Sequence, residues 1–185
     1  MLDLTEIDAY FGAYFTRTAF RIEALDVYTV DSEGDDVARY LGGEQEPTAD
    51  ARLPWLKELR DDTAAGKQWS RVHVLSTPLN DYLRYECEWG YVGNVAAGEQ
   101  VGIIDLSEQA LPAEVILGEF WLLDDEYLLL MQYDEAGHLL GGEPLPAQQL
   151  PRYRAAMKAA IAAAVPFTEW WARHPEEHRA NWAVV

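Results

Sequence analysis

The spacing of apolar residues changes several times along the chain, and each change marks a predicted element. Residues 3–15 carry apolar side chains at helical spacing, and Asp3 and Glu6 have the offset of a capping box, so a helix is predicted there. Residues 18–30 switch to the two-residue alternation of a strand. The alternation changes phase at Asp26, which indicates a bulge or a bend in the second half of this segment.

Two helices and a second strand are predicted next. Residues 35–41 and 53–65 have helical character, and glycine follows each of them as a stop signal. Residues 69–76 return to strand alternation, with valines opposite Arg71 and His73. Polar residues that alternate with apolar ones in this way are typical of a strand with two different faces.

The stretch over residues 69–106 forms the centre of the predicted fold. A Thr-Pro pair at residues 77–78 gives a favourable helix start after the strand. The buried stripe of this helix is predicted to consist of Leu79, Tyr82, Leu83 and Cys87. Three glycines, Gly90, Gly93 and Gly98, are expected to break the helix into a loop before a strand over residues 101–106. Two strands joined by a helix within one sheet imply a right-handed crossover and parallel pairing.

The second half of the chain predicts a meander and then a long helix. Strands are expected over residues 120–123 and 127–133, and a second hairpin turn leads into residues 138–140. An alanine-rich helix is expected over residues 148–165, followed by an aromatic segment after Pro166. The predicted class is α+β: a mixed, mainly antiparallel sheet with one crossover, packed against N-terminal and long C-terminal helices. Residues 1–185 are predicted to be one domain, with a core over 1–167 and an extension over 168–185.

Charge is the global property that most limits function. The chain of 185 residues has 32 acidic and 14 basic residues, a net charge of −18, and no Lys or Arg lies between Arg84 and Arg152. Such a field repels phosphate backbones, so direct nucleic-acid binding is not expected. Two interpretations stay open: the acidity serves solubility, or it forms a face for a basic protein partner.

Cysteine content and apolar runs bear on the compartment. The single cysteine, Cys87, cannot form an internal disulfide, and no apolar run approaches the roughly 18 residues needed to cross a bilayer. The N-terminal residues lack the basic region and cleavage site of a signal peptide. We therefore expect a cytoplasmic protein without membrane association.

No motif names a reaction. Phosphate-binding loops, dinucleotide fingerprints and G-x-S-x-G elbows are absent from the sequence, and no cofactor is predicted. His174 and His178 are four residues apart, but a surface helix is the simpler interpretation than zinc, and the acids at residues 124–126 are expected to form only a turn. Cys87 is expected to be a buried thiol. His73 is either a structural strand residue or a general base oriented by a nearby glutamate.

A ligand site is predicted on the polar face of the crossover helix. Arg84 is the last basic residue before the acid-only span, and it either forms a salt bridge or lies at the mouth of a pocket. Parallel sheets bind ligands above the carboxyl ends of their strands, which is where this helix begins. The candidate ligand-binding residues are Ser76, Asn80, Arg84, Tyr85, Glu88 and Asn94.

Four segments carry a resemblance to a known family: VLSTPLNDYLRYECEWGYVGNVAAGE, FWLLDD, QYDEAGHLLG and LPRYRAAMKAAIAAAVPF. The chain resembles, from about Phe20 to Phe167, an uncharacterised actinobacterial family with a domain of unknown function. The resemblance implies an acidic, cytoplasmic, single-domain protein, often encoded near helix-turn-helix regulators, and it supplies no catalytic residues. A fainter likeness to phospholipase D-like domains lacks the His-x-Lys-x4-Asp signature, so that activity is not expected.

Three functions follow as hypotheses. The leading one is a regulatory or accessory protein, not an enzyme, whose acidic half binds a basic protein such as a helix-turn-helix regulator. The alternative is a small-molecule-binding protein or enzyme with a pocket at the helix over residues 76–94. The third is a homodimerisation module, for which exposed Trp170, Trp171 and Trp182 would form the interface.

Overall fold

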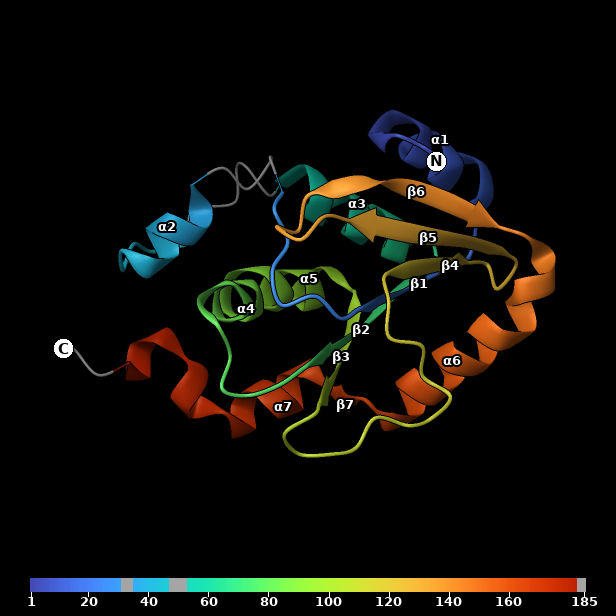
Figure 1. Cartoon of the computed structure of the whole chain (residues 1–185). Coiled ribbons are helices and arrows are strands. Elements are labelled where there is room, and N and C mark those ends of the chain that lie inside the picture. The colour runs from blue at the N-terminus through green and yellow to red at the C-terminus, as the bar shows by residue number, and fades with distance from the viewer. Residues whose placement is uncertain (31–34, 47–52, 183–185) are drawn as a thin grey trace.

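A computed structural model describes residues 1–30, 35–46 and 53–182, and shows a mixed sheet with helices on both of its faces (Figure 1). The strands are β1 (Thr18–Glu23), β2 (Gln68–Leu75), β3 (Gln100–Asp105), β4 (Phe120–Leu123), β5 (Tyr127–Tyr133), β6 (Leu139–Leu145) and β7 (Val165–Pro166). The α-helices are α1 (Leu4–Tyr14), α2 (Asp36–Leu41), α3 (Leu53–Ala64), α4 (Asp81–Tyr85), α5 (Val92–Ala97), α6 (Leu150–Ala163) and α7 (Phe167–Arg173). A π-helix, η2 (Glu86–Tyr91), joins α4 to α5, and short 3₁₀ turns η3 (Ala147–Gln149), η4 (Pro175–Glu177) and η5 (Arg179–Asn181) complete the described part.

The sheet has seven strands in the order β6-β5-β4-β1-β2-β3-β7. β1 pairs with β2 and β2 with β3 in parallel, whereas the other four neighbouring pairs are antiparallel. The predicted α+β class and mainly antiparallel sheet are therefore confirmed. The prediction of one crossover is incomplete, because the chain between β1 and β2, which contains α2 and α3, forms a second one.

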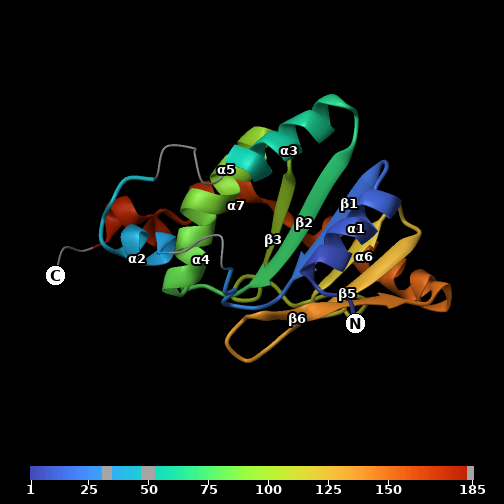
Figure 2. The same cartoon turned by 90° about the horizontal axis from the view of Figure 1, so that it is seen from above.

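Helix α6 covers one face of the sheet, which we call the α6 face (Figure 2). Alternate residues of the central strands point to it, and they are apolar throughout: Phe20, Ile22, Val72, Val74, Ile104, Phe120, Leu122 and Leu128. They pack against Leu150, Tyr153 and Ala160 of α6. Ile161 of the same helix is 51% exposed and lies outside this packing.

The opposite face, which we call the cavity face, lies under α1, α3, the α4–η2–α5 segment and α7 (Figure 2). Asp3 and Glu6 form the predicted capping box at the start of α1. Two apolar clusters lie on this face, one around Trp69, Trp121 and Leu129 and one around Ile103 and the aromatic residues of α4, η2 and α7. The charged residues Arg21, Glu23 and Arg71 lie on this face as well.

The α4–η2–α5 segment differs from its prediction. Gly90 and Gly93 were expected to end the helix, but both lie within it, and only Gly98, at φ +114°, terminates it. A Cβ on Gly98 would come within 2.4 Å of Thr63 Oγ1, so glycine is required there both for the left-handed backbone and for the approach to α3. Gly90 lies in the π turn η2, and Gly93 lies in α5.

The β4–β5 hairpin explains the run of acids at residues 124–126. Asp124 and Asp125 adopt positive φ values of 51° and 60°, as a tight hairpin turn requires. The Asp124 carboxylate accepts backbone hydrogen bonds from Thr16, Arg17 and Thr18, at distances between 2.7 and 3.3 Å. It therefore joins the end of α1 to the start of β1. The next strand, β6, runs through Gly142 to Leu145, whereas the prediction ended it at residue 140.

The C-terminal extension packs on the core rather than standing exposed. Trp170 is 0% exposed, and Trp171 and Trp182 are partly buried against the same cluster, so the prediction of three exposed tryptophans is wrong. His174 is also buried, which contradicts its predicted place on a surface helix. Among the described residues, no helix combines the length and apolarity that a bilayer span requires.

Candidate functional site

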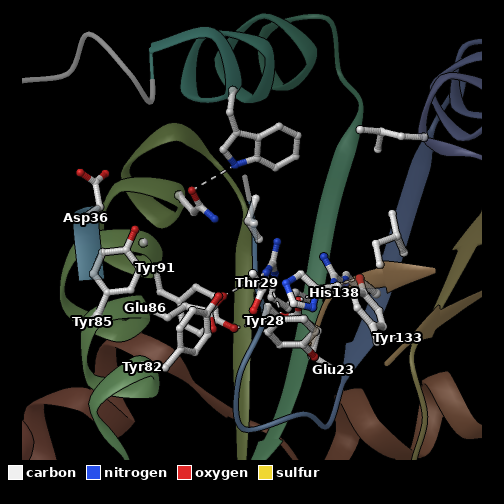
Figure 3. A pocket seen from close by; sticks show the side chains of 18 of the residues that line it. Glu23, Tyr28, Thr29, Asp36, Tyr82, Tyr85, Glu86, Tyr91, Tyr133 and His138 are labelled. Atoms are coloured by element: carbon white, nitrogen blue, oxygen red, sulfur yellow. Dashed lines mark hydrogen bonds and ion pairs between the residues drawn. The ribbon is translucent and has the colours of Figure 1, made fainter. Parts of the chain in front are cut away.

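A cavity of about 780 Å³ opens between the cavity face of the sheet and the helices above it. Figure 3 shows Glu23, Tyr28 and Tyr133 on one side of it and Tyr82, Tyr85 and Glu86 on the other. The size suits a small organic molecule, since ligand pockets usually measure roughly 300–1,000 Å³. Its lining combines aromatic rings with buried charged groups.

Two arginines form the floor of the cavity. Arg21 of β1 and Arg71 of β2 are direct neighbours in the parallel register, so their guanidinium groups lie side by side. Glu23 forms an ion pair with each of them: Arg21 Nη2 lies 2.8 Å from Glu23 Oε1, and Arg71 Nη1 lies 2.9 Å from Glu23 Oε2. The carboxylate thereby reduces the repulsion between the two guanidinium groups. Burial raises the pKa of the Glu23 carboxyl, but the two guanidinium charges outweigh it and hold the pKa at about 2.

Both arginines are held by further contacts. Arg71 Nε donates to Glu99 Oε1 at 3.0 Å, and Arg21 Nη2 donates to the Tyr133 hydroxyl at 3.1 Å. Two buried atoms of this cluster, Arg21 Nε and Glu99 Oε2, have no hydrogen-bond partner within the described residues. An unsatisfied buried polar atom costs roughly 1–3 kcal/mol, so the floor is not arranged for maximum stability.

Tyr91 links Glu23 to His73 and has one hydrogen for two acceptors. Its hydroxyl lies 3.0 Å from Glu23 Oε2 and 2.6 Å from His73 Nδ1. His73 Nε2 lies 3.1 Å from the Leu25 carbonyl oxygen, which can only accept, so Nε2 carries the imidazole hydrogen. Burial lowers the pKa of His73 and keeps the ring neutral. Nδ1 and Glu23 therefore compete for the Tyr91 proton.

A second buried carboxylate, Glu119, lies behind the cavity wall and holds Tyr28, which lines the cavity. Glu119 Oε2 accepts from the Tyr28 hydroxyl at 2.8 Å, and Glu119 Oε1 accepts from the Ala24 amide at 2.6 Å. Burial raises the pKa of Glu119. These bonds anchor the chain where it leaves β1, which is the bend that the phase change in the sequence predicted.

The helical wall comes from α4, η2, α5 and α3. Tyr82, Tyr85, Glu86 and Tyr91 reach the cavity from the first two of these elements. Asn94 lines the same wall, and its Oδ1 accepts from the indole Nε1 of Trp55 at 3.2 Å. The π turn brings Glu86 and Tyr91 into the lining together. Such turns are frequent at functional sites.

The structure divides the six predicted ligand residues into two groups. Tyr85 and Asn94 line the cavity, as a ligand-binding role requires. The other four, Ser76, Asn80, Arg84 and Glu88, are not part of its lining. Ser76 is exposed at the end of β2, and Asn80 caps α4 by accepting from the Leu83 amide at 2.8 Å.

Arg84 and Glu88 bind the C-terminal extension instead. Arg84 Nε lies 2.8 Å from Glu177 Oε2, which is the salt bridge that the sequence left as one of two interpretations. Glu88 Oε2 accepts from the Tyr40 hydroxyl at 3.0 Å and from the Arg179 amide at 2.9 Å. These contacts attach the extension to the helix that forms the cavity wall.

The floor of the site is not among the residues that the sequence predicts to bind a ligand. Arg21, Glu23 and Arg71 occupy the polar positions of alternating strands, but all three are buried or nearly so. One signal could have found them. Parallel strands in the middle of a sheet are covered on both faces, so charged residues within them are enclosed and need partners.

Comparison with protein families places the chain. A family model described as a domain of unknown function (DUF6879) matches residues 5–172. The chain belongs to this family. The match begins in α1 and ends in α7, so it includes every residue of the cavity floor and the helical wall. A search of curated proteins found no match.

Proposed function

We propose that this DUF6879 protein binds a small organic molecule in the cavity between β1, β2 and the α4–η2–α5 segment. The observation that carries the proposal is the buried Arg21–Glu23–Arg71 cluster on the cavity floor. A buried ion pair is weak evidence for stability, since apolar residues of the same volume often stabilise a fold as well or better. Fixed charges beneath an aromatic cavity instead provide orientation and specificity for a ligand.

The lining favours a ligand that carries an amine. Asp3, Glu23, Asp36 and Glu86 give the lining more acidic than basic groups, and the net charge of −18 disfavours anions. Both arginines already form ion pairs with carboxylates, which lowers their attraction for a ligand anion. Tyr82, Tyr85 and Tyr91 surround the Glu86 side of the cavity, and aromatic rings beside a carboxylate attract ammonium groups.

A matched pair of variants tests the proposal. Glu86 lines the cavity, whereas Glu114 is exposed in the segment before β4 and does not. A thermal-shift panel of amines, amino acids and carboxylic acids should identify amine-bearing compounds that raise the melting temperature. Calorimetry should then show at least about tenfold weaker binding for Glu86→Gln, which loses one charge contact of about 1.4 kcal/mol, and unchanged binding for Glu114→Gln. The proposal fails if no compound binds, or if both variants bind equally well.

A basic protein partner is the second proposal, and the charge distribution favours it. Seven acids of the basic-residue-free span are exposed: Glu108, Glu114, Asp125, Glu126, Asp134, Glu135 and Glu143. Four others, Glu99, Asp105, Glu119 and Asp124, are buried and engaged internally, so the acidic surface is smaller than the sequence implied. A helix-turn-helix regulator encoded nearby in an actinobacterial cytoplasm would supply such a partner. Recovery of the same basic protein at low salt and its loss at high salt would support this proposal, and recovery of no basic protein would refute it.

A further inference from the structure

A second cluster of polar groups lies apart from the cavity, where β3 ends. Asp105 is the last residue of β3, Glu108 follows in the turn, and His174 comes after the end of α7. One ligand atom from each of the three residues lies within 4.8 Å of the others. His174 Nε2 is 3.3 Å from Glu108 Oε1 and 3.9 Å from Asp105 Oδ2.

The orientation of His174 directs its Nε2 at two carboxylates. His174 is 7% exposed, and its ring stacks on Trp170 with centroids 4.5 Å apart. Its Nδ1 lies 2.8 Å from the Trp170 carbonyl oxygen, which only accepts, so Nδ1 carries a hydrogen. Nε2 faces Glu108 and Asp105. Either a proton on Nε2 or a cation between the three groups would balance the two carboxylate charges.

The surrounding contacts resemble the outer shell of a metal site. A histidine that ligates through one nitrogen almost always donates its other N–H to a carbonyl or carboxylate, as His174 does. Asp105 is oriented in the same manner: its Oδ1 accepts from the Ser107 amide at 2.9 Å, and its Oδ2 accepts from the Trp170 indole at 3.3 Å. Hydrogen bonds thus fix the directions of the two buried side chains of the cluster.

We infer that Asp105, Glu108 and His174 bind a divalent transition-metal ion, with Zn²⁺ or Mn²⁺ as the best-fitting candidates. Imidazole favours transition metals over Mg²⁺ and Ca²⁺, and two carboxylates suit both candidate ions. Ligand atoms about 2.1 Å from an ion lie about 3.0–3.4 Å apart in octahedral or tetrahedral geometry, close to the His174–Glu108 separation. Glu108 is exposed, so its side chain can move towards a bound ion. The 3.9 Å between His174 Nε2 and Asp105 Oδ2 requires a small shift of the two buried side chains as well. The three ligands leave coordination positions for water.

A titration of the metal-free protein tests the inference. Calorimetry with Zn²⁺ and Mn²⁺ should show one saturable site, and Mg²⁺ and Ca²⁺ should bind more weakly. Bound Mn²⁺ should show nitrogen coupling from an imidazole in pulsed electron paramagnetic resonance. Glu108→Gln should weaken binding at least about tenfold. Asp134→Asn is the matched control, because it disrupts the exposed His138–Asp134 pair and should leave the affinity unchanged. Equal weakening in both variants would overturn the inference.

Thermal stability separates a metal site from an ion pair between His174 and its acidic neighbours. If the cluster is a metal site, Zn²⁺ or Mn²⁺ raises the melting temperature of the natural protein but not that of Glu108→Gln. Without metal, the melting temperature of Glu108→Gln is then equal to that of the natural protein or higher. For an ion pair alone, neither metal raises the melting temperature, and Glu108→Gln lowers it. Because Glu108 is exposed, this variant should fold even where His174→Gln does not.

Discussion

The two faces of the central sheet arise from the same strands and differ in chemistry. On the α6 face, Phe20, Ile22 and Val72 are apolar and fully packed against one helix. On the cavity face, Arg21 and Arg71, which are next to these residues in sequence, are charged and line the cavity. Both sets are buried or nearly so. Apolar packing on the α6 face stabilises the fold, whereas the centre of the cavity face carries charged groups whose burial needs another reason.

The largest expected effect is on the α6 face. Phe120 is 0% exposed and packs edge-on against Tyr153. Phe120→Ala should lower the free energy of unfolding by about 3–5 kcal/mol, because it removes buried apolar surface and leaves a void. Urea denaturation measures the loss, which should be the same at pH 5 and pH 8 because no ionisable group is removed. A loss that depends strongly on pH would contradict this account of the face.

On the cavity face, Arg71→Met should cost about 3 kcal/mol, since it leaves Glu23 and Glu99 buried with fewer opposite charges. Unlike the Phe120 variant, it should lose less stability at acid pH, where Glu23 can take up a proton. Urea denaturation at both pH values checks this difference. Arg152→Met, at an exposed arginine of α6, is the control and should change stability by under about 0.5 kcal/mol. A cost for Arg71→Met as small as the control's would show that the cluster is not energetically coupled.

Acid should weaken the cavity face before the α6 face. The folded-state pKa of Glu23 is about 2 and its usual value is 4.5. Its contribution is therefore fully present above pH 4.5 and is lost as the pH falls towards 2. Asp124 behaves in the same direction: burial raises its pKa, but hydrogen bonds from Thr16 and neighbouring amides hold it at about 2. Stability measured from pH 6 to 2 should fall in the natural protein and fall less steeply in Arg71→Met.

The smallest expected effect concerns the shared proton of Tyr91. Tyr91→Phe removes one hydroxyl and should lower the free energy of unfolding by about 1 kcal/mol. Because Nδ1 of His73 then loses its donor, the ¹⁵N chemical shift of that atom should change while Nε2 stays bonded to Leu25. An unchanged Nδ1 shift would mean that the tyrosine proton belongs to Glu23 alone.

The helices and strands could be predicted from the sequence better than the residues of the cavity. The capping box of α1, the strands over residues 120–123 and 127–133, and the parallel pairing of β2 with β3 follow from local signals and agree with the structure. The π turn was missed because glycines usually end helices, and no local signal shows that packing against α3 keeps Gly93 helical.

Only part of the cavity could be anticipated. Tyr85 and Asn94 were identified because they lie on the crossover helix, above the parallel strands. Arg21 and Glu23 were not, because a two-residue alternation of polar and apolar residues looks the same whether the polar side meets water or a second buried layer. Part of the layer above Arg21 and Glu23 comes from α3 and the α4–η2–α5 segment, which follow β1 later in the chain, and their position depends on tertiary packing.

The attachment of the C-terminal extension has a mechanical consequence for the cavity. Glu177 and Arg179 hold Arg84 and Glu88, which lie on the same helical segment as Tyr82 and Tyr85. Detachment of the C-terminal extension, by proteolysis or by binding to another protein, would remove these contacts from the helical segment. Ligand affinity would then fall although no ligand contact had been removed, and a bound ligand would in turn tighten the tail by the same free energy. The contacts at Arg84 and Glu88 would thus couple the C-terminal extension to the proposed ligand cavity.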